Sequence, residues 1–152
     1  MSSRATPVVA RSAASAHAGR SRGDGAVRSA VGSVVKLLHR RRPVPPLIVQ
    51  VLDAADINGS LVPRQMLQRM VPKDGCEIVL AVNKIDRLPS VSKSVLLAAK
   101  FRASFEGGRD LASKILDAHG VNARTGEGVD RLAATLLKHA GEGADIVVLG
   151  AQ

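Results

Sequence analysis

Residues 77–82 form an apolar run, Glu-Ile-Val-Leu-Ala-Val, that ends directly in the polar sequence Asn83-Lys84-Ile85-Asp86. A short apolar run of this kind is typical of a strand that is buried on both faces of a parallel sheet. In open α/β sheets, ligands bind in the crevice outside the carboxyl ends of the strands. The sequence therefore predicts that the Asn-Lys-x-Asp loop leaves a parallel sheet at its ligand-binding edge.

The residue types in this loop suit recognition of guanine. The carboxylate of Asp86 can accept two hydrogen bonds, from the ring N1–H and the exocyclic amine of guanine, and adenine offers no matching pair of donors. Asn83 can brace the loop or meet the base edge. The stem of Lys84 can lie along the ring face with its ammonium in water. The alternative is a plain turn at a helix start, with Asp86 as its cap.

A second loop strengthens the guanine interpretation. Asn-Lys-x-Asp is the sequence by which GTPases select guanine, and residues 121–129, Val-Asn-Ala-Arg-Thr-Gly-Glu-Gly-Val, resemble the Ser-Ala-Lys loop of the same proteins. In that loop the backbone N–H of the alanine points at guanine O6, which makes Ala123 the matching position. Asn122 replaces the serine and Arg124 replaces the lysine. The alternative is a strand–turn–helix unit in which two glycines supply the turn.

The phosphate-binding part of such a protein is not found upstream. Residues 1–82 contain no GxxxxGK[ST] sequence. Near the other end, a charged turn precedes an apolar strand over 145–149, which leads into Gly150, Ala151 and Gln152. A strand followed by glycine is how a P-loop begins. We therefore expect these three residues to start a phosphate loop whose Lys and Ser/Thr are absent.

This order of motifs resembles the circularly permuted GTPases of the YqeH type, which occur in bacteria, chloroplasts and mitochondria. In that family the first strand runs into Asp-x-x-Asp-x-x-Gly-Ser, and residues 53–60 here read Asp-Ala-Ala-Asp-Ile-Asn-Gly-Ser. The family's Asn-Lys-x-Asp is followed by a hydrophobic residue and proline, as at Leu88-Pro89. The resemblance covers residues 47–152, and the four signatures stand in the family's order.

The resemblance implies an α/β fold, a parallel sheet with flanking helices that forms part of a P-loop GTPase domain in permuted order. It implies binding of a guanine nucleotide, GTP or GDP, and a role in ribosome biogenesis with rRNA or a ribosomal subunit as partner. The guanine-binding residues that it implies are Asn83, Lys84, Asp86 and Ala123.

We expect no catalytic residue and no metal-binding residue in this chain. Mg²⁺ would bind only if the missing part of the P-loop were supplied, because the hydroxyl that holds it is absent. Asp53 and Asp56 can be interpreted as an acid–base or Mg²⁺ pair, but the resemblance assigns them to a structural turn. We interpret the chain as a fragment or truncated product of a GTPase that does not itself hydrolyse GTP.

A second class of function remains open: a non-catalytic interaction protein that does not bind nucleotide and acts through its basic arm. Cysteine content excludes two further features. The four-cysteine zinc module found in many relatives of the family is ruled out, because Cys76 is the only cysteine. A single cysteine also excludes an internal disulfide.

The net charge of +9 is concentrated in a basic arm, residues 1–42, which carries nine basic groups and one acidic group. The partial GTPase domain, residues 43–152, is nearly neutral. The arm is rich in Ser, Ala and Arg, and three interpretations stay open: a chloroplast or mitochondrial transit peptide, a disordered segment that contacts rRNA phosphates, or a helix over 26–40 packed on the sheet. Without import the protein would be cytoplasmic. No apolar run reaches the roughly 18 residues of a transmembrane segment.

Apolar patterning also predicts the order of elements. We expect strands at 47–53, 77–82 and 145–149, and helices at 63–70, 92–105 and 127–139. The segment 109–120 has helical periodicity, whereas the resemblance implies a strand that runs into Ala123. We expect a short helix there that gives way to a strand near 115–121. Alternating strands and helices indicate a parallel sheet.

Overall fold

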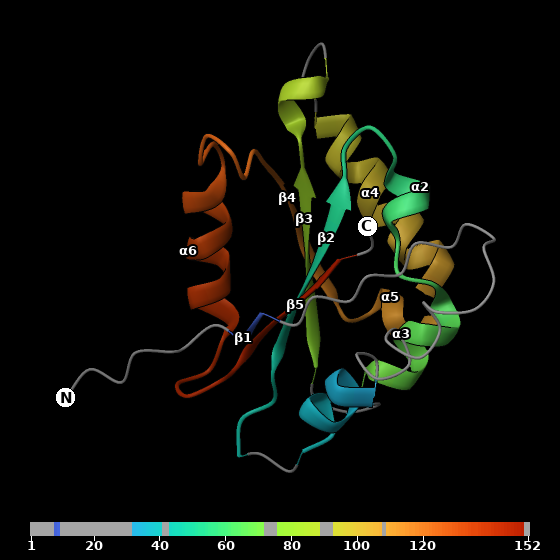
Figure 1. Cartoon of the computed structure of the whole chain (residues 1–152), viewed down its shortest axis with the longest axis vertical. Coiled ribbons are helices and arrows are strands. Elements are labelled where there is room, and N and C mark those ends of the chain that lie inside the picture. The colour runs from blue at the N-terminus through green and yellow to red at the C-terminus, as the bar shows by residue number, and fades with distance from the viewer. Residues whose placement is uncertain are drawn as a thin grey trace, which may run out of the picture.

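The computed structural model describes residues 8–9, 32–40, 43–71, 76–88, 93–107 and 109–150. They form a parallel sheet that is covered by helices on both faces (Figure 1). The strand order is β1-β5-β2-β3-β4. Four strands are of full length, β2 (Leu47–Asp53), β3 (Glu77–Asn83), β4 (Ile115–Val121) and β5 (Ile146–Gly150), and a two-residue strand, β1 (Val8–Val9), pairs with the outer edge of β5. The predicted α/β class, a parallel sheet with flanking helices, is confirmed.

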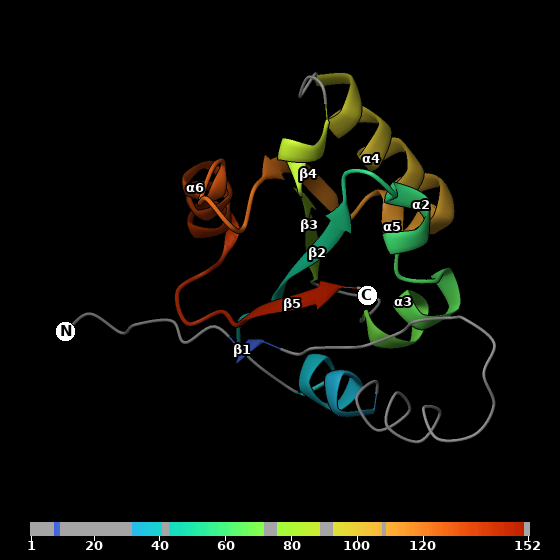
Figure 2. The same cartoon turned by 45° about the horizontal axis from the view of Figure 1, so that its top comes forward.

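Helices connect successive strands on the two faces of the sheet. Figures 1 and 2 show α6 on one face and α2 to α5 on the other. Their bounds are α2 (Ile57–Ser60), α3 (Arg64–Met70), the 3₁₀ turn η1 (Ile85–Arg87), α4 (Lys93–Gly107), α5 (Arg109–Ala112) and α6 (Val129–His139). The ambiguous segment is resolved as expected, into the short helix α5 followed by strand β4. The start predicted for the helix at 92 lies outside the described residues.

The direction of the connections defines one special edge of the sheet. The chain steps from β2 to β3 to β4 in one direction and then returns to place β5 on the other side of β2. The connections therefore change direction between β2 and β5, which makes this the topological switch point. Open α/β sheets bind their ligands at the carboxyl ends of the strands near such a point.

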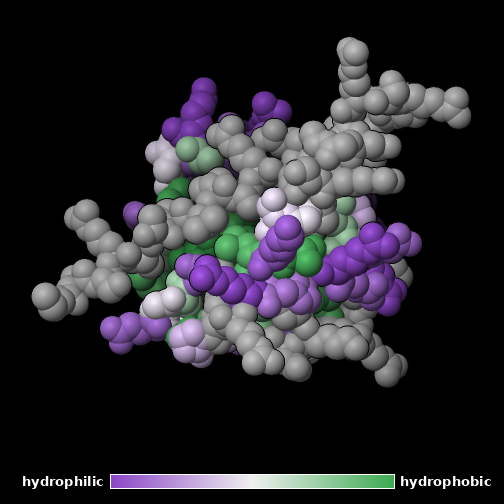
Figure 3. All heavy atoms as spheres, turned by 60° about the horizontal axis from the view of Figure 1, so that its bottom comes forward, coloured by the Kyte–Doolittle hydropathy of each residue, from purple (hydrophilic) through white to green (hydrophobic). Residues whose placement is uncertain are grey.

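The larger hydrophobic core lies on the α2–α5 face. Alternate residues of each strand point to this face, so Ile48, Leu80 and Leu149 are fully buried there. A helix at residues 32–38 packs against the same core through Val34 and Leu38. Seen from the amino-terminal ends of the strands, hydrophobic residues lie at the centre of the surface and hydrophilic residues lie beside them (Figure 3).

The smaller core lies on the α6 face. Its buried residues are Val49, Ala81 and Val121, one from each of three neighbouring strands. Helix α6 packs on them through Leu132 and Leu136, which are only partly buried. Within the described residues, this face is therefore covered by the amphipathic helix α6 alone, whereas several helices cover the opposite face.

The basic arm is described only in part. The helix at residues 32–38 falls within the helix predicted over 26–40, and residues 26–31 lie outside the described residues. The same holds for most of residues 1–31. The transit peptide and the rRNA-contacting segment therefore stay predictions, and what is established is that residues 34 and 38 belong to the core.

One polar side chain in the larger core gives a stability prediction. Gln50 is 2% exposed, and no hydrogen-bond partner for its Nε2 is seen among the described residues. An unpaired buried amide costs roughly 1–3 kcal/mol. We expect Gln50→Met, which keeps the volume and removes the amide, to raise the free energy of unfolding by about 1 kcal/mol in urea denaturation. Gln50→Ala should lower it by leaving a cavity. A destabilised Gln50→Met variant would show that the amide is paired.

Candidate functional site

The Asn-Lys-x-Asp loop begins where strand β3 ends. Asn83 is the last residue of β3, and Lys84 follows in the left-handed region with φ 65°. Among the described residues, it is the only non-glycine residue with a positive φ. Such a conformation costs about 1–3 kcal/mol and persists only when neighbouring structure holds it. Ile85 is buried, and the η1 turn that it starts carries Asp86 at the surface.

The loop after β4 is built around a buried asparagine. Asn122 is 4% exposed, and its Oδ1 accepts hydrogen bonds from the backbone N–H groups of Arg124 at 3.0 Å and Thr125 at 3.3 Å. Its own backbone closes the loop, because the Asn122 carbonyl accepts from the N–H of Gly126 and its N–H donates to the carbonyl of Glu127, both at 2.8 Å. The residue that departs from the Ser-Ala-Lys pattern therefore braces the loop through its side chain.

Two glycines form the turn of this loop, as in the strand–turn–helix unit considered for residues 121–129. Gly126 and Gly128 have φ values of 84° and 74°, which favour glycine. Gly128 is also the residue from which α6 starts.

The two loops meet because β3 and β4 are neighbours in the sheet. Asn83 lies opposite Val121 in the register, at the carboxyl ends of both strands. The backbone N–H of Ala123 donates a hydrogen bond to Oδ1 of Asn83 at 3.0 Å. This bond joins the two loops directly. It also uses the N–H that the resemblance assigns to guanine O6, so a base in that position would replace Asn83 as acceptor or share the hydrogen.

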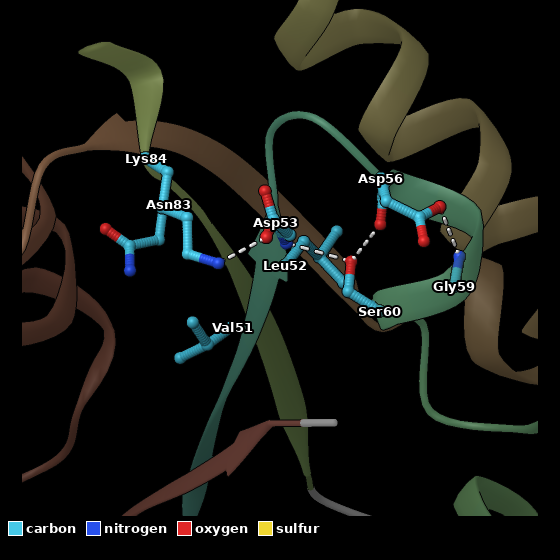
Figure 4. A pocket seen from close by; sticks show the side chains of 8 residues that line it. All are labelled: Val51, Leu52, Asp53, Asp56, Gly59, Ser60, Asn83 and Lys84. Carbon is cyan, nitrogen blue, oxygen red and sulfur yellow. Dashed lines mark hydrogen bonds and ion pairs between the residues drawn. The ribbon is translucent and has the colours of Figure 1, made fainter. Parts of the chain in front are cut away.

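Lys84 reaches toward β2. Its Nζ donates to Oδ2 of Asp53, the last residue of β2, at 2.5 Å (Figure 4). The hydrogen bond from Lys84 lowers the pKa of the Asp53 carboxyl below its ordinary 3.8, and burial opposes this shift. The ammonium that was expected to lie in water is therefore paired with a carboxylate of the neighbouring strand.

Residues 53–60 form a hydrogen-bonded turn, as the resemblance implies. Oδ1 of Asp56 accepts from the N–H of Gly59 at 2.8 Å. The hydroxyl of Ser60 donates to the Asp56 carbonyl at 2.6 Å and accepts from the N–H of Asp53 at 2.8 Å (Figure 4). These bonds stabilise the start of α2 beside the end of β2.

A cleft of about 460 Å³ opens between this turn and the Asn-Lys-x-Asp loop, at the carboxyl ends of β2 and β3 (Figure 4). It lies next to the switch point of the sheet. Gly150, the first residue of the expected phosphate loop, ends β5 opposite Val51 of the cleft wall. Ala151 and Gln152 lie outside the described residues. The residues that line the cleft are Val51, Leu52, Asp53, Asp56, Gly59, Ser60, Asn83 and Lys84.

The four residues expected to bind guanine are therefore close in the fold but differ in what they contact. Asn83 and Ala123 bond to each other, and Lys84 bonds to Asp53. Asp86 is exposed, and no hydrogen bond or ion pair to its carboxylate is seen within the described residues. Its carboxylate is the acceptor that remains available to a ligand.

Two residues of the site were not expected to act as they do. Asp53 was assigned to the turn alone, and the brace from Asn122 was not foreseen. The position of Asp53 beside the Asn-Lys-x-Asp loop could have been inferred from the runs 47–52 and 77–82. Parallel strands of equal length place residue 53 beside residue 83. Nothing in the local pattern distinguishes a buried from an exposed Asn122.

The Asn122 brace gives a second stability prediction. Asn122→Ala removes the acceptor of two backbone N–H groups in a buried position, so we expect the free energy of unfolding to fall by about 1–2 kcal/mol. Asn122→Ser, which restores the residue of the resembled loop and keeps an oxygen, should recover part of that loss. Urea denaturation measures both variants. Equal stability of wild type and Asn122→Ala would show that the side chain does not brace the loop.

Two kinds of feature are not found in the described part of the chain. It holds no cluster of three or more His, Cys, Asp or Glu side chains that could bind a metal ion. None of its helices is both long and apolar enough to cross a membrane. Comparison with models of known protein families gives no match, and comparison with curated protein sequences gives none either.

Proposed function

We propose that residues 83–86 and 122–124 bind the guanine base of a nucleotide, as the base-selecting part of a GTPase-type domain in permuted order. The observation that carries the proposal is the 3.0 Å hydrogen bond from the Ala123 N–H to the Asn83 side chain. It brings together, at the ligand-binding edge of a parallel sheet, the two loops between which a guanine ring would lie.

Each residue has a distinct role in this proposal. The Asp86 carboxylate accepts from N1–H and the exocyclic amine of guanine. The Ala123 N–H donates to guanine O6 while it shares its hydrogen with Oδ1 of Asn83, and the Asn83 side chain can also meet the base edge. The stem of Lys84 supplies an apolar surface beside the ring while its ammonium stays on Asp53.

The described residues offer few favourable contacts to the phosphates of GTP or GDP. The cleft beside the Asn-Lys-x-Asp loop, residues 83–86, called the base loop below, holds the carboxylates of Asp53 and Asp56 and the ammonium of Lys84, which leaves a net charge of −1 near the switch point. No P-loop Lys or Ser/Thr is present in the sequence to hold phosphates or Mg²⁺. The proposed ligand of the described residues is therefore the base.

The expected affinity follows from these contacts. Hydrogen bonds to a charged group contribute about 1.5–3 kcal/mol each. Association costs about 4–15 kcal/mol of translational and rotational freedom. Two such bonds with some ring burial then support millimolar binding at best, since a Kd of 1 mM corresponds to about −4 kcal/mol.

We therefore expect GTP, GDP and GMP to bind about equally weakly, in the millimolar range, with no GTP hydrolysis by the chain alone. Calorimetry or an amide-resonance titration gives the three affinities, and phosphate release gives the turnover. The matched control is ATP, ADP and AMP at the same concentrations, which corrects for phosphate binding to the basic arm. Micromolar binding of GTP, or measurable turnover, would contradict a proposal in which this chain holds the base alone.

The wider role rests on the family resemblance. We propose that the chain belongs to a GTPase that assembles bacterial-type or organellar ribosomal subunits, with rRNA or a ribosomal subunit as partner and a chloroplast or mitochondrion as its compartment. The basic arm supports this role by its charge, which suits either import or contact with RNA phosphates.

A further inference from the structure

Two hydrogen bonds join the carboxyl ends of β2 and β3 beside the base loop. The N–H of Ala54 donates to the carbonyl of Asn83 at 2.8 Å, and Lys84 donates to Asp53. The register explains both, because Asp53 and Asn83 are direct partners in the parallel pair. The first bond holds the backbone before residue 84, and the second holds the side chain of residue 84 itself.

Asp53 is the fixed member of the pair. Its Oδ1 accepts from the N–H of Ala55 at 3.0 Å, its N–H donates to Ser60, and its side chain is 25% exposed. Lys84 is 44% exposed, and Asp53 is the only bonding partner of its ammonium among the described residues. Asp53 therefore orients Lys84, and its own orientation is set by the turn at 53–60.

We propose that Asp53 is a positioning residue for the base loop: by holding the Lys84 ammonium it keeps residue 84 left-handed and so keeps the Asn83 side chain aimed at Ala123. The part of this inference that concerns affinity rests on the proposed guanine binding. The part that concerns the loop does not, because it describes the ligand-free protein. The loop is then formed before a base arrives, which reduces the ordering cost of binding.

A global stabilising role does not follow from the same pair. Ion pairs with this much exposure contribute little to the stability of the whole protein. Loss of the pair should therefore leave the unfolding midpoint nearly unchanged and act on the loop alone. This separates a positioning role from a structural one.

Four variants test the inference: Asp53→Asn, Lys84→Met, the double variant, and Asp56→Asn as the matched control. Asp56→Asn removes a carboxylate from the same cleft without touching Lys84, and its amide oxygen can still accept from Gly59. The first readout is the Ala123 amide resonance without ligand. The second is the affinity for GMP, with AMP as the unmatched base, and the unfolding midpoint is recorded for every variant.

We expect Asp53→Asn and Lys84→Met to shift the Ala123 resonance in the same direction and to weaken GMP binding about threefold to tenfold, which lies in the lower part of the range for directly coupled residues. The double variant should be no worse than either single variant, because both act on one contact. Asp56→Asn should change neither readout.

The two proposals fail in different ways. A wild-type protein that binds GMP and AMP equally would refute guanine recognition, and the ligand-free Ala123 resonance would still decide the role of Asp53. An Asp53→Asn variant with an unshifted Ala123 resonance would overturn the positioning role. So would a double variant whose effect is the sum of the single effects, and neither result would affect a GMP preference of the wild type.

Discussion

Replacing Gly128 with alanine is expected to lower the free energy of unfolding by about 3 kcal/mol or more. Gly128 has φ 74°, where an L-residue costs about 1–2 kcal/mol. A Cβ built there would lie only 2.1 Å from the carbonyl oxygen of Gly120, which belongs to the backbone of β4 and cannot turn aside. Forced overpacking adds about 1–3 kcal/mol. Urea denaturation of the purified variant measures the loss.

Gly126 supplies the matched control in the same loop. It has φ 84°, but a Cβ built on it has no neighbouring atom within 4 Å. Gly126→Ala should therefore lower the free energy of unfolding only by the cost of a left-handed backbone at an L-residue, about 1–2 kcal/mol. If the two variants lost equal stability, the close approach of Gly128 to β4 would not constrain the start of α6, and the described loop geometry would be wrong.

Asp86→Asn is expected to exchange guanine preference for xanthine preference. The amide keeps one acceptor for N1–H and replaces the other with a donor, so the exocyclic amine of guanine loses its partner and O2 of xanthine gains one. Loss of a charge-assisted bond of about 1.5–3 kcal/mol should weaken GMP binding roughly tenfold or more, and XMP binding should strengthen. Titrations of the amide resonances with both nucleotides give the ratio of affinities.

The control for this exchange is Asp130→Asn, which neutralises another exposed carboxylate in the first turn of α6. It should leave both affinities unchanged, and neither variant should alter the unfolding midpoint, because both side chains are exposed. An Asp86→Asn variant that binds GMP as well as the wild type does would remove Asp86 from the base site.

The two central strands of the sheet, β2 and β3, were predictable because they are buried on both faces. Residues 47–52 are apolar except for Gln50, and residues 78–82 are continuously apolar, a pattern that a half-buried strand or an amphipathic helix does not give. Strand β4 was harder, since residues 115–121 include Asp117, His119 and Gly120. It lies at the edge of the sheet, where one side is open to solvent, so apolar residues are needed at fewer positions.

The candidate site was predictable only in its backbone layout. Motif spacing placed the Asn-Lys-x-Asp loop and Ala123 at the ends of strands, and neighbouring strands brought them together. The partners of the side chains were not predictable in the same way. The Lys84–Asp53 pair depends on the strand register together with a left-handed residue 84, and the Ala123–Asn83 bond depends on how Asn122 folds its own loop.

The most direct test of guanine recognition is an amide-resonance titration of the wild-type protein with GMP, IMP and AMP. IMP lacks only the exocyclic amine, so it should lose one of the two bonds to Asp86 and bind more weakly than GMP. The predicted result is that GMP shifts the resonances of residues 83–87 and 122–125 toward saturation in the millimolar range, IMP shifts the same resonances less, and AMP shifts none of them. Equal shifts with GMP and AMP, or GMP shifts confined to residues outside these two loops, would contradict the account.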